Sequence, residues 1–431
     1  MAEVAMIVRG GRVVDQRGER TADVAVTAEG DIVEVGADLD AAGTGARVLD
    51  ATGCVVAPGF VDVHVHFREP GQEDAETIES GARCAARGGY TAVVTMPNTQ
   101  PAIDSAAVAR QVLETGRGTV CDVHTSAAVT IGRQGGALSP MAELAELGVR
   151  LFTDDGAGVQ DERLMRRAME YGRALDVTLA QHCEIESLAS GGHMHEGEWS
   201  SQLGIPGIPA EAEELMVSRD IALARLTGAR IHFQHLSTAG SVELVRAAKA
   251  AGLPVTAEVT THHLALTDAC CAGYDPVFKV NPPLRTEADI AALKAAVADG
   301  TIDAIATDHA PHTQHAKEQP FDHAPPGMLG LETALAVARC ELDVDLATLV
   351  GLLSWRPAAI AGIADRHGGP VEAGRPANLV VFDPDVAWTV DPADTASRSR
   401  NNPYAGRQVR GRVRHTVLEG EPVVIDGEVQ R

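Results

Sequence analysis

Between about residue 58 and residue 364, short apolar runs typical of strands alternate with alanine-rich stretches that carry apolar residues at helical spacing. Helical spacing is clear at 210–226 and at 241–251. Strands that alternate with helices form parallel sheets, and eight such units favour a closed (β/α)8, or TIM, barrel over a doubly wound sheet. The eight strand-like runs begin near Phe60, Thr91, Val120, Val149, Val177, Arg230, Pro254 and Ile302.

The two ends of the chain differ from its middle. Glycine turns separate short β-like runs at both ends, namely 7–14, 23–26, 378–383, 413–417 and 423–427. We therefore predict an α/β protein in which residues 58–364 form the barrel. Residues 1–57 and 365–431 are expected to form the two parts of one small β-sandwich module.

The bulk properties exclude several classes of protein. A net charge of −24, from 60 acidic and 36 basic residues, argues against a nucleic-acid surface or an anionic membrane patch. No apolar run approaches the roughly 20 residues of a membrane span, and the N-terminus lacks a signal pattern. The 7 cysteines, without C-x-x-C spacing, fit reduced thiols. These features predict a cytoplasmic protein.

A His-x-His pair closes the first barrel strand. His64 and His66 stand two residues apart, so in a strand they share a face and can bind one metal ion together. Arg68 faces the same way if the strand continues, where it can bind an anion beside the metal. Taken alone, the pair fits equally well with two polar residues near a strand end.

Other potential metal ligands favour a metal site at this pair, because they also follow strand-like runs. Parallel barrel strands present their C-terminal ends at one rim, where active sites of such barrels lie. These strand-end residues are Asp154, Asp155, His182, His235 and Asp308.

This donor set is too large for one tetrahedral zinc ion. Two ions need a bridging group, and either Asp155 or Asp154 is the available carboxylate. A bridged pair can hold a hydroxide and polarise a carbonyl, which is the chemistry of metal-assisted hydrolysis. Zinc fits the histidine and carboxylate ligands best, although other divalent ions are compatible with them.

Several further residues favour plainer interpretations. His193 and His195 repeat the His-x-His spacing, but they lie in a glycine-rich stretch and are expected to be solvated. His232 is expected to face away from His235. Structural roles are favoured over pocket-lining or zinc-binding roles for His262, His263 and Cys183. The long connections 190–209 and 310–327 fit either active-site lids or surface excursions.

Seven short motifs, in this order along nearly the whole chain, resemble those of the dihydroorotases of the amidohydrolase superfamily. That family interconverts N-carbamoyl-L-aspartate and L-dihydroorotate in pyrimidine (UMP) biosynthesis. Each motif alone is weak, but their order and spacing are specific. The motifs are DVHVHFR at 62–68, MPNT at 96–99, FTDDG at 152–156, HCE at 182–184, QHLST at 234–238, NPPLR at 281–285 and ATDHAPH at 306–312.

The resemblance implies two zinc ions, one bound by His64, His66 and Asp308 and the other by His182 and His235. Asp155 stands where the bridging ligand is expected. Many relatives use a carboxylated lysine there, and no lysine occurs near residue 155. The chain thus resembles the branch that uses aspartate, in which the second ion is expected to bind less tightly.

The resemblance also implies a mechanism and a set of substrate contacts. A metal-bound hydroxide attacks the ring amide carbonyl, and Asp308 transfers the proton to the departing nitrogen. A guanidinium suits the substrate carboxylate, because the two pair through parallel hydrogen bonds. The implied contacts are Arg68, Asn98 and His312 to the carboxylate, and Asn281, Pro326 and Gly327 to the ring.

Two rival functions stay open at this point. Another cyclic-amide hydrolase, such as a hydantoinase, dihydropyrimidinase or allantoinase, would share the metals but bind a different ring. An inactive dihydroorotase-like scaffold for aspartate carbamoyltransferase would lack metal ligands or Asp308, and none is missing here. We expect a homo-oligomer that acts on a small molecule, with association with the carbamoyltransferase left open.

Overall fold

Eight parallel strands form the centre of the protein in the computed structural model, which describes residues 3–39 and 45–430. Every strand begins within two residues of its predicted start, so the α/β barrel prediction is confirmed. The strands are β6 (Phe60–Val65), β7 (Tyr90–Thr95), β8 (Asp122–Thr125), β9 (Leu151–Phe152), β10 (Thr178–Gln181), β13 (Ile231–Phe233), β14 (Val255–Thr260) and β15 (Ala304–Ala306).

The barrel closes through two isolated bridges. Hydrogen bonds join β6, β7 and β8 into one run and β9, β10, β13, β14 and β15 into another. A parallel bridge between Ala127 and Phe152 connects β8 to β9, and one between Val65 and His309 connects β6 to the end of β15. All strands therefore present their C-terminal ends at the same rim.

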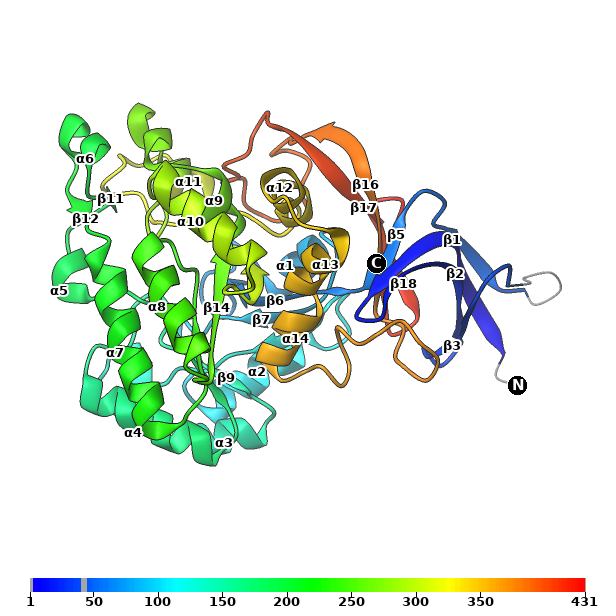
Figure 1. Cartoon of the computed structure of the whole chain (residues 1–431), viewed down its shortest axis with the longest axis horizontal. Coiled ribbons are helices and arrows are strands. Elements are labelled where there is room, and N and C mark those ends of the chain that lie inside the picture. Colours follow the sequence, from blue (N-terminus) through cyan, green and yellow to red (C-terminus); the bar gives the residue numbers. More distant parts are fainter. Residues whose placement is uncertain (1–2, 40–44, 431) are drawn as a thin grey trace.

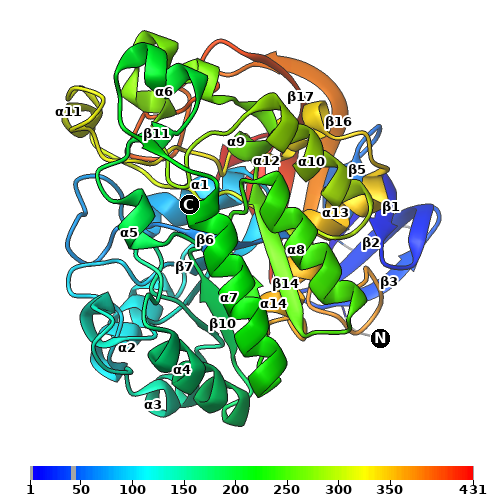
Figure 2. The ribbon, with the colours of Figure 1, turned by 60° about the vertical axis from the view of Figure 1, so that its left-hand side comes forward.

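Helices cover the outside of the barrel, and α4, α7 and α8 lie side by side (Figure 2). The predicted helices at 210–226 and 241–251 correspond to α7 and α8. The helices between and after the strands are α1 (Ile78–Arg87), α2 (Ala106–Gly116), α3 (Met141–Glu146), α4 (Glu162–Ala174), α7 (Glu211–Thr227), α8 (Ala239–Ala250), α10 (Glu287–Ala298), α12 (Ala334–Glu341), α13 (Leu346–Leu353) and α14 (Trp355–Ala361).

Strands from both chain ends form a second sheet beside the barrel (Figure 1). Its order is β19-β18-β17-β16-β5-β1-β2-β3, with β4 paired to β1. The two ends meet where β5 pairs antiparallel with β16. The strands are β1 (Val4–Asp15), β2 (Gly18–Thr27), β3 (Ile32–Gly36), β4 (Arg47–Asp50), β5 (Val55–Pro58), β16 (Leu379–Thr389), β17 (Gln408–Leu418), β18 (Glu421–Ile425) and β19 (Glu428–Val429).

Alternate side chains along the strands of this sheet pack into two different hydrophobic cores, because successive side chains of a strand point to opposite faces. Val56 and Val381 pack in a core made by the terminal segments. Their neighbours Val55 and Phe382 pack in the core that extends into the barrel. The terminal segments therefore form one β-rich module that is fastened to the barrel, while the division at residues 57 and 364 stays a prediction.

The long connections at the C-terminal rim contain short elements. Residues 190–209 hold β11 (Met194–His195), α6 (Glu198–Leu203) and β12 (Gly207–Ile208), and residues 310–327 hold α11 (Gln314–Lys317). The remaining short elements are α5 (Glu186–Ala189), α9 (Thr261–Ala265) and the 3-10 helices at 131–133, 268–273 and 276–278.

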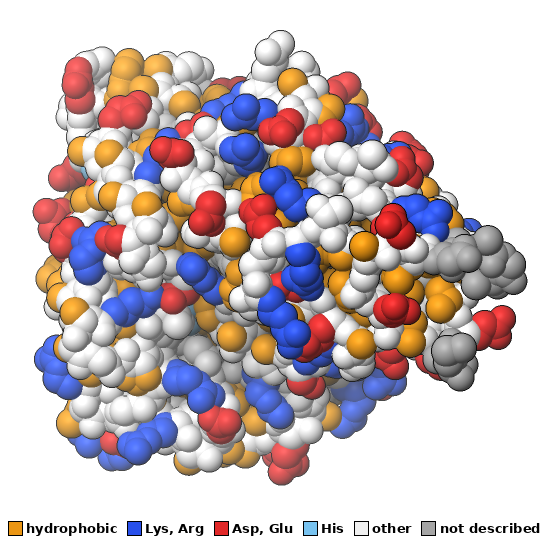
Figure 3. Space-filling view, turned by 45° about the vertical axis from the view of Figure 1, so that its right-hand side comes forward, with side chains coloured by type: hydrophobic (Ala, Val, Ile, Leu, Met, Phe, Trp, Pro, Cys, Tyr) orange, Lys and Arg blue, Asp and Glu red, His pale blue; other side chains and the backbone are white. Residues whose placement is uncertain are grey.

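The surface carries charges of both signs. Basic and acidic side chains are interspersed on the face shown in Figure 3. Among the described residues, no helix combines the length and the apolar character that crossing a membrane requires.

Candidate active site

Four histidines surround one carboxylate at the C-terminal rim of the barrel. Asp155 Oδ1 lies 3.3 Å from His64 Nε2, 3.6 Å from His182 Nδ1 and 3.8 Å from His235 Nε2. Its other oxygen, Oδ2, lies 3.6 Å from His66 Nε2. All five side chains are buried. The structure thus brings histidines from three different strand ends onto a carboxylate that follows a fourth strand.

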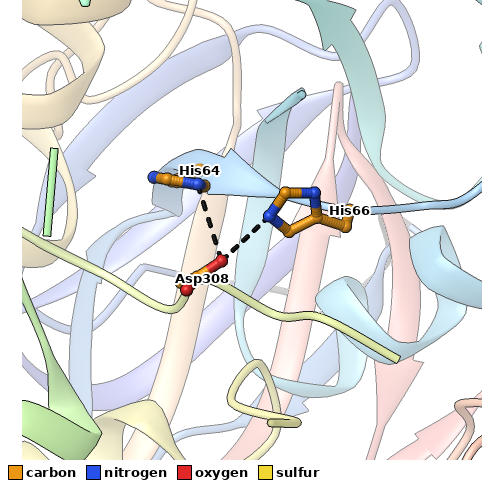
Figure 4. Close-up of side chains that lie close together, drawn as sticks. All are labelled: His64, His66 and Asp308. Atoms are coloured by element: carbon orange, nitrogen blue, oxygen red, sulfur yellow. Dashed lines mark hydrogen bonds and ion pairs between the residues drawn. The ribbon is translucent and has the colours of Figure 1, made fainter. Parts of the chain in front are cut away.

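Asp308 completes one half of this cluster (Figure 4). Its Oδ1 lies 2.9 Å from His66 Nε2 and 3.5 Å from His64 Nε2, so both imidazoles point to the same oxygen. In the other half, His182 Nδ1 lies 2.9 Å from His235 Nε2. The arrangement divides into two adjoining sets of donors with Asp155 between them.

Asp154, the alternative bridging carboxylate, points away from the cluster. It accepts hydrogen bonds from the backbone N–H of Thr130 at 3.0 Å and from the Thr130 hydroxyl. Asp155 instead accepts a hydrogen bond from Asn98 Nδ2 at 3.3 Å. The structure therefore favours Asp155 for the position between the histidines.

The cluster is strongly polarised. Burial opposes the charged form of Asp155, but the surrounding imidazoles, His64 foremost, hold the pKa of this carboxyl well below its usual range. Burial also opposes the charge on His64, yet Asp155 and Glu258 raise its pKa well above the usual value. The pKa of Asp308 is lowered in the same way, with burial opposed by His64 and His66.

The donors fit a divalent metal centre. Within the described residues, His64 Nε2 and His235 Nδ1 are buried nitrogens that have no hydrogen-bond partner. Ligand atoms lie within 4.8 Å of one another in the set His64, His66 and Asp308, and again in the set His64, Asp155 and His235. Imidazole nitrogens and carboxylate oxygens are ligands that zinc accepts.

The backbone turns sharply where the strands deliver these residues. His235 and Asp308 have φ angles of 30° and 46°, and Arg68 has a φ of 62°. Such left-handed conformations cost non-glycine residues about 1–3 kcal/mol each and cluster at functional sites. The strand does not continue to Arg68, because β6 ends at Val65, so the condition on which Arg68 was expected to share a strand face with His66 is not met.

A cavity of about 160 Å³ opens directly onto the cluster. This volume is below the roughly 300–1,000 Å³ typical for drug-sized ligands, so it suits a small ring. Two larger cavities, of about 640 and 670 Å³, contain none of the candidate ligands. The 160 Å³ cavity brings together all six predicted substrate contacts: Arg68, Asn98, Asn281, His312, Pro326 and Gly327.

A cationic group marks one wall of this cavity. Arg68 Nε donates to the carbonyl of Pro311 at 3.1 Å, and its terminal nitrogen lies 3.3 Å from His312 Nε2. Burial lowers the pKa of Arg68 to about 10, which leaves the guanidinium charged at neutral pH. Burial and then Arg68 lower the pKa of His312 well below its usual value, so this imidazole is neutral.

Other residues that line the cavity offer further polar groups. Asn281 Oδ1 is buried, and no other group in the described part of the chain forms a hydrogen bond with it. Gly327 has a φ of 142°, and an added Cβ would lie 2.8 Å from His312 Nε2. Asn98 is already engaged, since its Oδ1 lies 2.9 Å from His66 Nδ1.

Glu258, which the sequence interpretation missed, lies beneath the cluster. Its Oε1 is 2.7 Å from His64 Nδ1, and its Oε2 is 2.9 Å from His232 Nε2. The prediction that His232 faces away from the site is therefore wrong. The left-handed turn at His235 breaks the two-residue alternation on which that prediction relied. A charged residue inside the apolar strand β14 was the available signal.

The structure agrees with some, but not all, of the expectations for histidines and cysteines outside the cluster. His195 is buried, with its Nδ1 3.0 Å from a terminal nitrogen of Arg285, so the prediction of a solvated side chain is wrong. His193 is partly exposed. His263 has a structural contact with the carbonyl of Pro282, at 3.0 Å. Burial raises the pKa of the Cys183 thiol well above its usual value, which disfavours a zinc thiolate.

Comparison with known proteins decides the family. A family model described as Dihydro-orotase-like matches residues 53–241. A dihydroorotase of Streptomyces coelicolor is 49% identical to the chain, over 98% of this chain and 99% of its own length. This chain belongs to the dihydroorotase family. A dihydroorotase of Mycobacterium tuberculosis is 48% identical, over 99% of this chain and 100% of its own length.

Solved structures of related enzymes share the fold of this dihydroorotase family member. An L-hydantoinase (dihydropyrimidinase) from Arthrobacter aurescens superposes with a TM-score of 0.88 at 25% identity, and 99% of this chain and 98% of that chain are covered. A dihydropyrimidinase from Brevibacillus agri gives a TM-score of 0.84 at 24% identity, over 98% of this chain and 96% of that one. The second likeness, at this low identity, shows the fold alone.

Proposed function

We propose that the protein is a dihydroorotase, which reversibly hydrolyses L-dihydroorotate to N-carbamoyl-L-aspartate in de novo pyrimidine biosynthesis. One observation carries the choice of substrate: the charged Arg68 lines the same small cavity as the imidazole and carboxylate cluster. A cyclic amide that bears a carboxylate matches both parts of this cavity. In the hydrolytic direction, the ring C–N bond breaks, the carbonyl carbon gains a hydroxyl and the nitrogen gains a proton.

The metal centre in this proposal consists of two zinc ions. His64, His66 and Asp308 hold one ion, His182 and His235 hold the other, and Asp155 lies between them. A bound pair lowers the pKa of a coordinated water and polarises a carbonyl oxygen. Among the described residues, the unpartnered Nε2 of His64, which faces both Asp155 and Asp308, supports this assignment.

Asp308 is the proposed general acid and base. It lines the cavity and is ionised at neutral pH, because His64 and His66 lower its pKa against the effect of burial. In hydrolysis it therefore starts as the base, takes a proton from the attacking water and returns it to the departing ring nitrogen. The same proton moves in the opposite order when the ring closes.

The remaining cavity residues orient the substrate. Arg68 and His312 are proposed to bind its carboxylate, with Asn98 as a further donor beside them. Asn281 and the backbone at Pro326 and Gly327 are proposed to contact the ring. These contacts fix the amide carbonyl toward the cluster, which is how positioning lowers a reaction barrier.

A substrate panel tests the proposed function. Purified protein with added zinc should interconvert L-dihydroorotate and N-carbamoyl-L-aspartate, with hydantoin turned over at least about 10²-fold less efficiently because it lacks the carboxylate. Preference for hydantoin would instead favour the hydantoinase function of the structural relatives. Silence on every substrate despite bound zinc would favour the inactive scaffold.

Replacing Arg68 with methionine should remove the recognition of the carboxylate. We expect kcat/KM for L-dihydroorotate to fall by about 10²-fold or more, the usual effect of truncating one partner of a buried charge pair. Arg68→Lys should recover only part of this loss, since lysine keeps the charge but lacks the planar fork. Dihydrouracil, which has the ring without the carboxylate, is the control substrate. An equal fall for both substrates would contradict carboxylate binding.

Replacing Glu258 with glutamine should weaken metal binding without removing a ligand. Glu258 contacts His64 Nδ1 and so orients its Nε2 toward the cluster. Loss of such outer partners typically lowers metal affinity by about 10–100-fold. Competition with a zinc chelator measures the affinity. Thr256→Val, which alters only the outer contact of His232, is the control and should leave the affinity nearly unchanged. Equal affinities in all three proteins would rule out this role for Glu258.

The cytoplasmic location, the homo-oligomer and the association with aspartate carbamoyltransferase stay predictions. Sizing of the purified protein, alone and mixed with the carbamoyltransferase, checks the last two.

A further inference from the structure

A second group of histidine and carboxylate side chains lies away from the active site. Asp122 is the first residue of β8, and His124 follows two residues later on the same strand face. His367 comes from the segment between α14 and β16. Because Asp122 stands at the N-terminal end of its strand, this group, named here the floor cluster, occupies the barrel end opposite to the active site.

The floor cluster has the spacing of a metal site. Asp122 Oδ2 lies 3.0 Å from His367 Nε2 and 3.3 Å from His124 Nε2. The three ligand atoms all lie within 4.8 Å of one another, and the two imidazole rings are nearly perpendicular, at 87°. Tetrahedral zinc with bonds of about 2.0–2.2 Å holds its ligands about 3.3 Å apart. Small adjustments would therefore place one ion between these atoms.

The surroundings of His367 orient it for such a role. Its side chain is fully buried, and its Nδ1 lies 3.2 Å from the hydroxyl of Thr91. A hydrogen bond from one imidazole nitrogen to an outer partner is the usual device that directs the other nitrogen to a metal. Thr91 lies in β7, so the floor cluster is anchored on two adjacent barrel strands.

His124 supplies the second, independent observation. Its Nε2 is a buried atom that forms no hydrogen bond with any described residue, although it lies 3.3 Å from Asp122. A cavity of about 670 Å³ is lined by Asp122 and His124 and is bordered by Leu418 and Glu421 of the terminal sheet. This space gives an ion a route of entry and gives water access to a fourth ligand position.

We propose that Asp122, His124 and His367 bind a divalent transition metal ion of the zinc class, separate from the catalytic pair. The ion joins strand β8 to the segment that leads from α14 into the terminal sheet. Its role is structural, because it connects parts of the chain that are far apart in sequence and no residue of the floor cluster lines the active-site cavity. Ions bound only by the folded state stabilise it.

Metal analysis of three full-length proteins tests this proposal. Wild type, His124→Ala and the control His315→Ala, which removes an exposed histidine, are stripped with chelator, reloaded with zinc and desalted. We expect His124→Ala to hold one zinc ion per chain fewer than wild type, with kcat/KM for L-dihydroorotate within about twofold of wild type. His315→Ala should match wild type in zinc content.

Thermal unfolding gives a second readout. Added zinc should raise the Tm of the stripped wild type more than that of His124→Ala, because the variant has lost one stabilising ion. Asp122→Asn keeps the shape of the side chain and should lose the same zinc ion and the same part of the zinc-induced rise in Tm as His124→Ala. Agreement between the two variants shows that the loss does not come from a folding defect in one of them. Equal zinc contents and equal zinc-induced shifts in wild type and both variants would overturn the proposal. Zinc content and the zinc-induced shift in Tm are compared between wild type and floor-cluster variants, so this test does not depend on whether the protein acts on dihydroorotate.

Discussion

Asp308→Asn should lower kcat for L-dihydroorotate by at least about 10³-fold, since general acid and base catalysis contributes about 10²–10⁴-fold and the same side chain is a proposed metal ligand. The amide keeps the shape of the carboxyl group, but it can neither take the proton from water nor return it to the ring nitrogen. Initial rates in both directions measure the effect. By microscopic reversibility, ring closure should be slowed as much as ring opening.

Asp303→Asn is the matched control for Asp308. Asp303 stands just before the same strand, β15, and accepts hydrogen bonds from the backbone N–H of Ala257 and from Lys249. The asparagine oxygen can still accept the first of these bonds, so we expect activity within about twofold of wild type and a stability loss of at most about 1 kcal/mol. Activity of Asp308→Asn close to that of this control would contradict the assigned role.

Asp155→Asn should disrupt the metal centre. The substitution keeps the size of the side chain but removes the negative charge that lies within 4 Å of four imidazoles. We expect zinc content at the active site to fall from two ions to one at most. Loss of a residue that only hydrogen-bonds to a metal ligand typically lowers activity by about 10–100-fold. The fall in kcat/KM should be larger for Asp155→Asn, because a bridging ligand is lost. Metal analysis and initial rates on the same samples check both effects.

The adjacent Asp154→Asn offers a control of the same type. Asp154 is equally buried but binds Thr130 instead of facing the histidines. Burial raises the pKa of Asp154, so the protein already disfavours its charge and should tolerate the neutral amide. We expect Asp154→Asn to keep zinc content and activity near those of wild type. Asp155→Asn should lose both. The reverse pattern would assign the bridge to Asp154.

The barrel and most of the cluster could be predicted from the sequence because parallel strands impose a common geometry. Once eight strand starts are recognised, the C-terminal ends must meet at one rim, and residues such as His182 and His235 are brought together without any knowledge of side-chain contacts. The strand starts differ from the structure by two residues at most, which leaves the order of ligands unchanged.

What sequence could not predict depends on backbone turns and on partners distant in the chain. The choice between Asp154 and Asp155 is decided by Thr130, which lies 24 residues from Asp154 along the chain. Arg68 and His235 adopt left-handed conformations, so the simple alternation of a strand does not describe where they point. Glu258 gains its role only because the barrel places it under His64.

The most direct test is to titrate zinc into chelator-stripped protein and to follow the initial rate of N-carbamoyl-L-aspartate cyclisation at each addition. It shows whether zinc at the active site is required for the reaction. We expect negligible turnover by the stripped protein, and a rate that rises with zinc bound at the active site and becomes constant when two ions are bound there. Tight binding of the first ion followed by weaker binding of the second would fit the aspartate bridge. Full turnover by the stripped protein, or no turnover of this substrate at any zinc content, would contradict a zinc-dependent dihydroorotase.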